Sequence, residues 1–265
     1  TGTLSTPTPT PVGPSVTPTT TLPPSAAGVV ISQVYGGGGN AGAPYANDFI
    51  ELFNAGTSPV SVAGWSVQYA SSSGTSWQKT DLLAQTLQPG QYLLVQEGSG
   101  GTCPSPCVPL PTPDVTGSIA MSGTTGKVVL STAAVLLSGA CPSGMSIRDT
   151  VGYGAAGCFE GTGSAPALSS STAARRAENG CVDTDQNAAD FTTAAPAPRT
   201  RMAPIVTCQP VATSTATVVA EPSATATTSS TPTIPAETAT TTASPVVTPT
   251  TGLAKWQVYL PLLVR

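Results

Sequence analysis

The stretch "VVISQVYGGGGNAGAPYANDFIELFN", residues 29–54, decides the fold. It holds two runs, 29–35 and 48–54, that are rich in Val, Ile and Phe. Gly, Asn and Pro, the residues that form turns, separate the two runs. Each run has the length and composition of a β-strand, so the stretch predicts two strands joined by a flexible loop. The "GGGG" at 36–39 matches no phosphate-binding pattern, because no Lys and no helical segment follow it.

Side chains alternate in character along "FIELFN", the second of these runs. Successive side chains of a strand point to opposite faces, so Ile50 and Leu52 share one face and Phe49, Glu51 and Phe53 share the other. We expect the Ile/Leu face to point into the core. Glu51 is then expected among aromatic side chains near the outer face.

Further short runs of the same kind follow along the chain, and no segment shows the 3.6-residue period of an amphipathic helix. The expected strands are 29–35, 48–54, 60–70, 91–97, 117–121, 127–131 and 147–154. Several short strands separated by frequent turn residues are typical of a two-sheet sandwich. The sequence therefore predicts an all-β sandwich.

Longer motifs indicate a family. The residues "NDFIELFN" (47–54), "GWSVQY" (64–69), "LQPGQYLLVQE" (87–97) and "CVDTDQNAADFTTAAPAPR" (181–199) closely resemble the successive blocks of bacterial lamin-tail domains. The resemblance covers about residues 28–199 and implies an immunoglobulin-like β-sandwich. It also implies an exported or cell-surface bacterial protein, because such modules often accompany secreted nucleases or surface proteins. It does not by itself assign a function.

The composition divides the chain into four parts. Residues 1–27 form a Thr/Pro-rich arm, 28–200 the sandwich, 201–252 a Thr/Ser/Pro-rich linker, and 253–265 a C-terminal apolar strand. Thr/Ser/Pro-rich segments are typical of O-glycosylated stalks and of plain disordered linkers, and both interpretations stay open. We expect any glycan to be O-linked, since the sequence has no Asn-x-Ser/Thr site.

Charge and residue content exclude several classes of function. The net charge is −4, and only nine residues are Lys or Arg, so nucleic acid is not an expected partner. No apolar run approaches the ~20 residues of a transmembrane helix. His is absent, which excludes Ser-His-Asp catalysis and His-ligated metals. Acid pairs such as Asp48 with Glu51, or Asp149 with Glu160, are more simply read as scattered surface acids, so we expect no catalytic residues and no enzyme activity.

The six cysteines are Cys103, Cys107, Cys141, Cys158, Cys181 and Cys208. None lies in a Cys-x-x-Cys pair, which argues against a zinc ribbon or a thioredoxin-like motif. An even number of Cys in a Thr/Pro-rich chain favours disulfides in an extracytoplasmic compartment. Fifteen connectivities are possible. We predict the pairing of nearest neighbours, Cys103–Cys107, Cys141–Cys158 and Cys181–Cys208, and free buried thiols are the alternative.

"DTDQNAAD", residues 183–190, places side-chain oxygens at alternate positions. Asp183, Asp185 and Asn187 resemble the start of a calcium loop, because Ca²⁺ prefers six to eight oxygen ligands. The segment lacks the Gly and the closing Glu of an EF-hand. A turn or an ion pair with Arg175 or Arg176 is the simpler interpretation, and calcium is the only cofactor that the sequence suggests.

The closing segment "WQVYLPLLVR", residues 256–265, also has a period of two. One face carries Trp256, Val258, Leu260, Leu262 and Val264, and the other carries residues that include Tyr259 and Pro261. Such alternation predicts a strand, and Pro261 confines it to the edge of a sheet. The strand could fold back on its own sandwich, serve as an export or anchoring tag, or be donated to a neighbouring copy.

Donation from one copy to the next is a head-to-tail contact, which builds rings or open filaments. We therefore expect a secreted structural protein that assembles into an extracellular fibre through residues Trp256, Val258, Tyr259, Leu260, Leu262 and Val264, with other copies of itself as partners. The alternative is a monomeric extracellular module that binds DNA, polysaccharide or cell wall.

Overall fold

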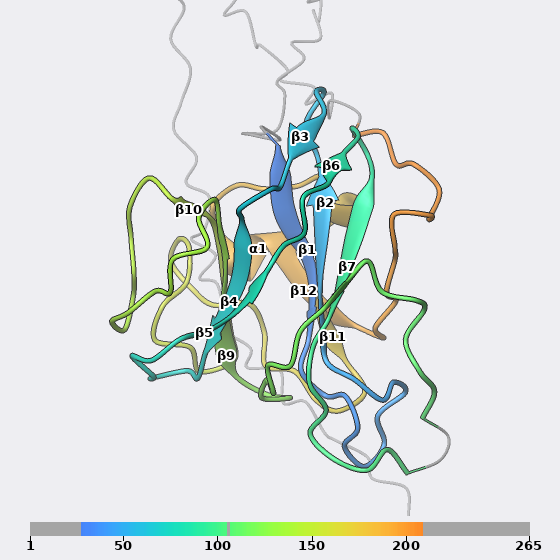
Figure 1. Cartoon of the computed structure of the whole chain (residues 1–265). Coiled ribbons are helices and arrows are strands. Elements are labelled where there is room, and N and C mark those ends of the chain that lie inside the picture. The colour runs from blue at the N-terminus through green and yellow to red at the C-terminus, as the bar shows by residue number, and fades with distance from the viewer. Residues whose placement is uncertain (1–27, 105–106, 209–265) are drawn as a thin grey trace, which may run out of the picture. The chain divides into compact units, whose positions relative to one another are not determined.

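The computed structural model describes residues 28–104 and 107–208 and shows two β-sheets packed face to face (Figure 1). The larger sheet has the strand order β12-β11-β1-β2-β7-β8 and the smaller one β10-β9-β4-β5. All neighbours are antiparallel except the parallel pair β7–β8. This arrangement confirms the predicted all-β, immunoglobulin-like sandwich.

The strands of the larger sheet are β1 (Val29–Tyr35), β2 (Phe49–Asn54), β7 (Tyr92–Gln96), β8 (Val115–Thr116), β11 (Ala173–Arg176) and β12 (Phe191–Ala194). Those of the smaller sheet are β4 (Ser66–Ala70), β5 (Gln78–Asp81), β9 (Gly126–Ser131) and β10 (Ile147–Tyr153). β3 (Val60–Ser61) and β6 (Thr86–Leu87) pair in a separate two-stranded sheet, and two single turns, η1 (Glu178–Gly180) and α1 (Asn187–Asp190), lie in the described chain.

The main core lies between the two sheets. Ile50 and Leu52 of β2 point into it, as the alternation of "FIELFN" predicts, and meet side chains such as Val67 and Leu130 from the smaller sheet. Phe53 packs in a second cluster on the outer face of the larger sheet, its ring centroid 4.6 Å from that of Tyr92. The central strands β1, β2 and β7 of the larger sheet are therefore largely apolar on both faces, which is why they read as nearly continuous hydrophobic runs.

Two expected strands differ in the structure. Residues 60–70 are interrupted by a turn, because Gly64 has a φ of +77° and the Trp65 N–H donates to the Val62 carbonyl. Residues 117–121 follow β8 without joining its strand pair. The Gly117 N–H donates to the Gln96 carbonyl of β7. Two further N–H groups bind carboxylates: Ile119 donates to Glu97 and Met121 donates to Asp48. Side chains that accept these hydrogen bonds take the place of a neighbouring strand.

The glycine run 36–39 lies in the loop between β1 and β2, as predicted, and is buried. The Gly38 N–H donates to Asp48 Oδ1 at 2.8 Å, and a Cβ on Gly38 would collide with the backbone of Asn47 and Asp48. The run therefore serves close packing of one backbone against another.

The described chain continues on the domain past the expected boundary at residue 200. The segment 195–208 crosses the outer face of the larger sheet, where the Val206 N–H donates to the Gly90 carbonyl. In Figure 1 it is the orange loop beside β7. It ends at Cys208, which is bonded to Cys181. The full chain divides into two units, Thr1–Val218 and Val219–Arg265, and the second lies outside the described residues.

Three disulfides join the same pairs that the nearest-neighbour pairing predicts: Cys103–Cys107, Cys141–Cys158 and Cys181–Cys208. They fit an oxidising, extracellular setting. Across residues 28–104 and 107–208, no helix is long and apolar enough to span a membrane.

Candidate functional site

The densest group of charges surrounds Arg176, the last residue of β11, whose side chain is fully buried. Its guanidinium lies 2.7 Å from Asp149 Oδ2, 2.7 Å from Asp183 Oδ1 and 3.5 Å from Asp190 Oδ2. Its Nε also donates to the Ile31 carbonyl at 2.8 Å. The arginine thus joins β10, the loop after β11 and β1, and so ties the two sheets together.

Two β-bulges bring Asp149 to this position. The register of β1 shifts between Ile31 and Gln33, and that of β10 shifts between Ile147 and Asp149. The bulges let the Ile31 N–H donate to Asp149 Oδ2 at 2.6 Å across the gap between the two sheets. Bulges often re-aim a side chain at a site of this kind. The sequence pattern of either strand gives no sign of them.

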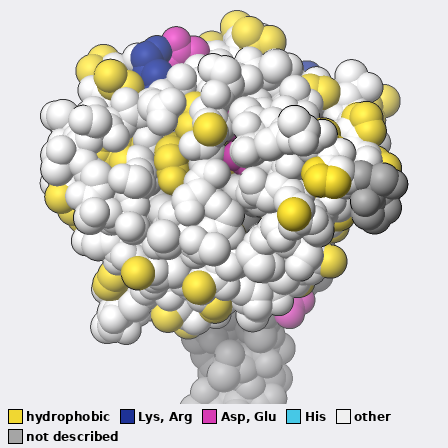
Figure 2. Space-filling view, turned by 90° about the horizontal axis from the view of Figure 1, so that it is seen from below, with side chains coloured by type: hydrophobic (Ala, Val, Ile, Leu, Met, Phe, Trp, Pro, Cys, Tyr) yellow, Lys and Arg dark blue, Asp and Glu magenta, His cyan; other side chains and the backbone are white. Residues whose placement is uncertain are grey.

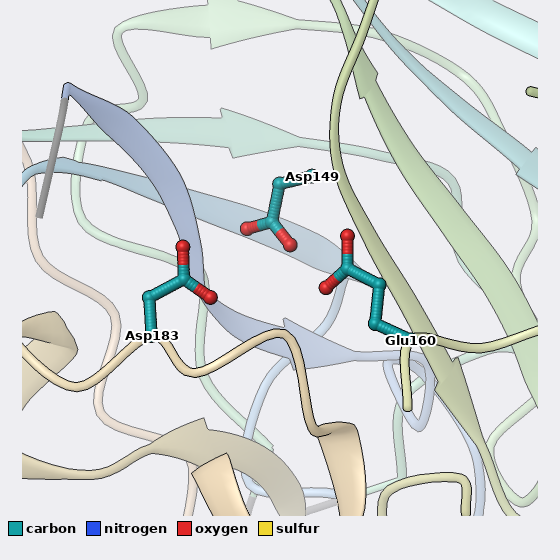
Figure 3. Close-up of side chains that lie close together, drawn as sticks. All are labelled: Asp149, Glu160 and Asp183. Atoms are coloured by element: carbon teal, nitrogen blue, oxygen red, sulfur yellow. The ribbon is translucent and has the colours of Figure 1, made fainter. Parts of the chain in front are cut away.

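Glu160, in the loop after β10, completes the group on its open side. Its Oε1 accepts from the Thr150 N–H at 2.9 Å, and its Oε2 lies 3.4 Å from the amide nitrogen of Asn187. One carboxylate oxygen from each of Asp149, Glu160 and Asp183 lies within 4.8 Å of the others. Figure 3 shows the three carboxylates pointing toward a common centre. We call Asp149, Glu160, Asp183 and Arg176 the carboxylate cluster.

Burial and mutual repulsion raise the pKa of two acids of this cluster, Glu160 and Asp183. Desolvation, followed by the charge of Asp149, raises the pKa of Glu160 to about 9. Desolvation also raises the pKa of Asp183 to about 6, although the Arg176 charge opposes that change. Both shifts have the direction expected where negative charge is concentrated in a poorly hydrated place.

The structure places the three residues of the predicted calcium loop in different surroundings. Asp183 joins the carboxylate cluster, whereas Asp185 is exposed and has a φ of +53°. Asn187 is buried, and its Oδ1 accepts from the N–H groups of Gly152 and Glu160. Sequence reasoning noticed the pair Asp149 and Glu160 but read it as surface acid. The third member, Asp183, lies too far along the chain for spacing alone to add it.

A second, half-buried arginine lies on the opposite side of the larger sheet. Arg199 Nη2 donates to Glu51 Oε1 at 2.7 Å, and the Arg199 N–H donates to Glu51 Oε2 at the same distance. The guanidinium also stacks 3.8 Å from the ring centroid of Tyr92. Glu51 therefore lies on the aromatic outer face, as expected, but the segment 195–208 covers it and leaves it fully buried.

A third acidic group contains no arginine. Asp48 and Glu97 are both buried, and desolvation raises the pKa of each to about 7. Asp48 accepts from the N–H groups of Gly38 and Met121, and Glu97 accepts from that of Ile119. The two carboxylates thus replace missing strand pairing at one end of the sandwich.

The surface offers a shallow polar hollow on the outer face of β11 and β12. Its lining includes Arg175, Glu178, Asn179 and Thr192, and Glu178 and Asn179 have positive φ. Figure 2 shows a different face, seen from below, with few charged side chains and with apolar side chains in small separate groups. That face offers no concentration of positive charge for a nucleic-acid backbone.

The predicted subunit-interaction residues, Trp256 to Val264, lie outside the described residues. Any contribution that they make to assembly depends on their own sequence and on the sheet edges of the domain. The sheets end at β12 and β8 in the larger one and at β10 and β5 in the smaller one.

Comparison with known proteins identifies the sandwich. The family model of the Lamin Tail Domain matches residues 23–155, about half of the chain. The chain belongs to the lamin tail domain family. No curated protein matches it.

The family match ends before three members of the carboxylate cluster. Asp149 lies inside the matched range, whereas Glu160, Arg176 and Asp183 follow it. Strands β11 and β12 also follow it and complete the larger sheet. Immunoglobulin-like domains of this family are structural or binding modules, and the fold is typically non-enzymatic.

Proposed function

We propose that this lamin tail domain protein is an extracellular structural protein without catalytic activity, and that it assembles by donating residues 256–264 to a neighbouring copy. The observation that carries the proposal is the alternation of the closing segment, which puts five large apolar side chains on one face. Full burial of such a side chain contributes about 1.5–3 kcal/mol. A segment of this kind gains most from a sheet edge that already exists.

The edge strand β10 is a poor acceptor, because other groups already bind it. The Ala165 N–H donates to the Gly152 carbonyl, and Asn187 Oδ1 accepts from the Gly152 N–H. Glu160 accepts from the Thr150 N–H. The carboxylate cluster and the loop after β10 thus cover this edge.

The edge strand β12 is the better acceptor. It has no charged residue, and its middle residues Thr192 and Thr193 are exposed. Within the described chain, only β11 pairs with it. The edge strand β5 instead carries the ion pair of Lys79 with Asp81, and charges on an edge oppose further pairing. Strand β8 has only two residues.

The Thr/Ser/Pro-rich linker 209–252 is long enough for the strand to reach another copy. A coil of this length spans roughly 35–40 Å on average, which exceeds the radius of a domain of this size. O-glycans on its Thr and Ser residues would keep the linker extended and hydrated. Head-to-tail donation then gives an open filament or a ring.

Deletion of residues 254–265 tests the proposal. The full chain should form oligomers in size-exclusion chromatography and filaments or rings in negative-stain microscopy, and the truncated chain should be monomeric. The double substitution Leu260→Asp and Leu262→Asp should abolish assembly, because it places charge on the apolar face. Leu263→Asp, on the opposite face, is the matched control and should retain assembly. A full chain that is monomeric at high concentration would overturn the proposal.

The polar hollow beside β12 supports a second candidate, a monomeric binding module for an extracellular polymer. Arg175, Asn179 and Thr192 offer donors and acceptors of the kind that bind a polysaccharide. In that case the truncated chain should be retained on immobilised polysaccharide, and Arg175→Ala should reduce the retention. Retention of the truncated chain together with a monomeric full chain would favour this candidate over assembly.

A further inference from the structure

The three acids of the carboxylate cluster have the spacing of a cation site. Their facing oxygens all lie within 4.8 Å of one another. Ca²⁺ binds oxygens at roughly 2.3–2.6 Å, so ligands on opposite sides of one ion lie about 4.6–5.2 Å apart. One ion at the common centre in Figure 3 could therefore contact all three side chains.

One oxygen of the cluster is buried and unpartnered, and Figure 3 shows that the carboxylate group to which it belongs faces Glu160 and Asp183. Asp149 is 1% exposed, and its Oδ1 has no hydrogen-bond partner among the described residues. Its Oδ2 is already held by Arg176 and by the Ile31 N–H. A buried acceptor without a donor is strongly unfavourable. A cation between Asp149, Glu160 and Asp183 would satisfy it.

The charges around Arg176 do not balance. Asp149, Asp183 and Asp190 contact its guanidinium, and Glu160 is close enough to act on its charge. Four carboxyl groups therefore surround one positive charge. Asp190 is fixed as an acceptor by the N–H groups of Thr184 and Gln186, which leaves the other three to face the centre.

We propose that Asp149, Glu160 and Asp183 bind one Ca²⁺ ion. Carboxylate oxygens suit a hard divalent cation, and Ca²⁺ tolerates the irregular geometry of ligands from three separate segments better than Mg²⁺ does. The ion adds to the contacts of Arg176 in joining β10 to the loop after β11. The site does not depend on the proposed assembly, and its ligands differ from the set Asp183, Asp185 and Asn187 that the sequence predicts.

The test uses the full chain and Ca²⁺ itself. Elemental analysis first measures the Ca²⁺ bound to the purified protein. A chelator then removes bound ions, and isothermal titration with CaCl₂ at pH 7.5 measures binding. We expect one Ca²⁺ per chain, with a dissociation constant of about 0.1–1 mM, as in other extracellular modules, or tighter. Mg²⁺, titrated in parallel, should bind more weakly.

Two variants that each replace a carboxyl group by an amide distinguish the ligand sets. Glu160→Gln keeps an acceptor for the Thr150 N–H, so it should fold, and it should weaken Ca²⁺ binding at least roughly tenfold. Asp185→Asn, at an exposed position, should leave binding unchanged. Circular dichroism and the melting temperature in chelator check that both variants are folded.

Three results would overturn the proposal. One is a full chain that carries no ion after purification and shows no saturable binding up to 10 mM Ca²⁺, about tenfold above the expected range. Another is a loss of binding in Asp185→Asn that equals the loss in Glu160→Gln. The last is tighter binding of Mg²⁺ than of Ca²⁺.

Discussion

Arg176 and Arg199 differ in the charge that surrounds them. Arg199 faces one carboxylate, Glu51, in a pair of equal and opposite charge. Arg176 contacts three, Asp149, Asp183 and Asp190. Arg199 keeps part of its side chain in solvent, with 20% exposed, and that of Arg176 is fully buried.

The difference shows that ion pairs have two roles in this domain. The pair of Arg199 with Glu51 is neutral and holds the segment 195–208 against the outer face of one sheet. The carboxylate cluster joins two sheets and concentrates negative charge that one arginine does not neutralise. A neutral pair is complete by itself, whereas a cluster with excess charge depends on a further cation or on protons.

Removal of Arg176 should have the largest effect. Arg176→Met keeps much of the volume but leaves the surrounding carboxylates and the Ile31 carbonyl without their donor. Loss of one partner of a buried ion pair lowers the free energy of unfolding by about 3–5 kcal/mol. Urea unfolding at pH 7.5 measures the change. A smaller loss than that of Arg199→Met would contradict the contrast between the two arginines.

The Cys181–Cys208 disulfide links the regions of the two arginines, because Cys181 precedes Asp183 and Cys208 ends the segment that Arg199 holds. Replacement of both cysteines by Ser should lower the free energy of unfolding by about 3 kcal/mol. Hydrogen exchange should increase more at residues 199–206 than at residues 173–176. Removal of the Cys103–Cys107 bond, which closes a shorter loop, is the control and should have a smaller effect.

Arg199→Met should destabilise the domain by about 2 kcal/mol, because it leaves the buried Glu51 with fewer donors. Part of the loss should be recovered when Glu51→Gln is added, since the amide removes the unpaired charge. A double-mutant cycle by urea unfolding measures the coupling between the two side chains. Strictly additive losses would mean that the two side chains do not act as a pair.

Glu97→Gln should have the smallest effect, and its sign should depend on pH. Burial raises the pKa of Glu97 to about 7, so the folded state binds a proton more tightly than the unfolded state. The stability linked to this proton is present below about pH 4 and is lost as the pH rises through about 7. The variant should therefore gain stability relative to wild type at pH 8 and little at pH 5.

Melting temperatures across that pH range test the prediction for Glu97. Gln91→Glu, which adds a carboxylate at a less buried position, is a control for a general charge effect. An equal pH dependence in wild type and Glu97→Gln would mean that Glu97 titrates normally.

Local patterns predict the centre of this fold well. The alternation in "FIELFN" assigns Ile50 and Leu52 to the core, and the closeness of the cysteines along the chain predicts the pairs that the structure contains. Strands β11 and β12 were missed, because "AARR" and "FTTA" have weak strand patterns. They form through pairing with β1 and with each other, and tertiary pairing of this kind leaves little local signal.

The carboxylate cluster could not be predicted from the sequence either. Its members Asp149, Glu160 and Asp183 lie on segments that are distant along the chain. Two bulges and the pairing of strand β11 bring these segments close together. Period and spacing describe neighbours along the chain, and a bulge changes the direction of a side chain without a change in that pattern. Only the alternation of Asp and Asn in 183–187 gave a partial signal.

The proposed assembly can be tested most directly by producing two forms of the chain together, the full chain and an isotope-labelled chain that ends at residue 253. Native mass spectrometry then counts the labelled chain in each oligomer. Strand donation predicts mixed oligomers with one labelled chain each, because a chain without the strand can accept a strand but cannot donate one. Closed rings would contain only full chains. Open oligomers that never take up a labelled chain, or a full chain that stays monomeric, would contradict donation between copies.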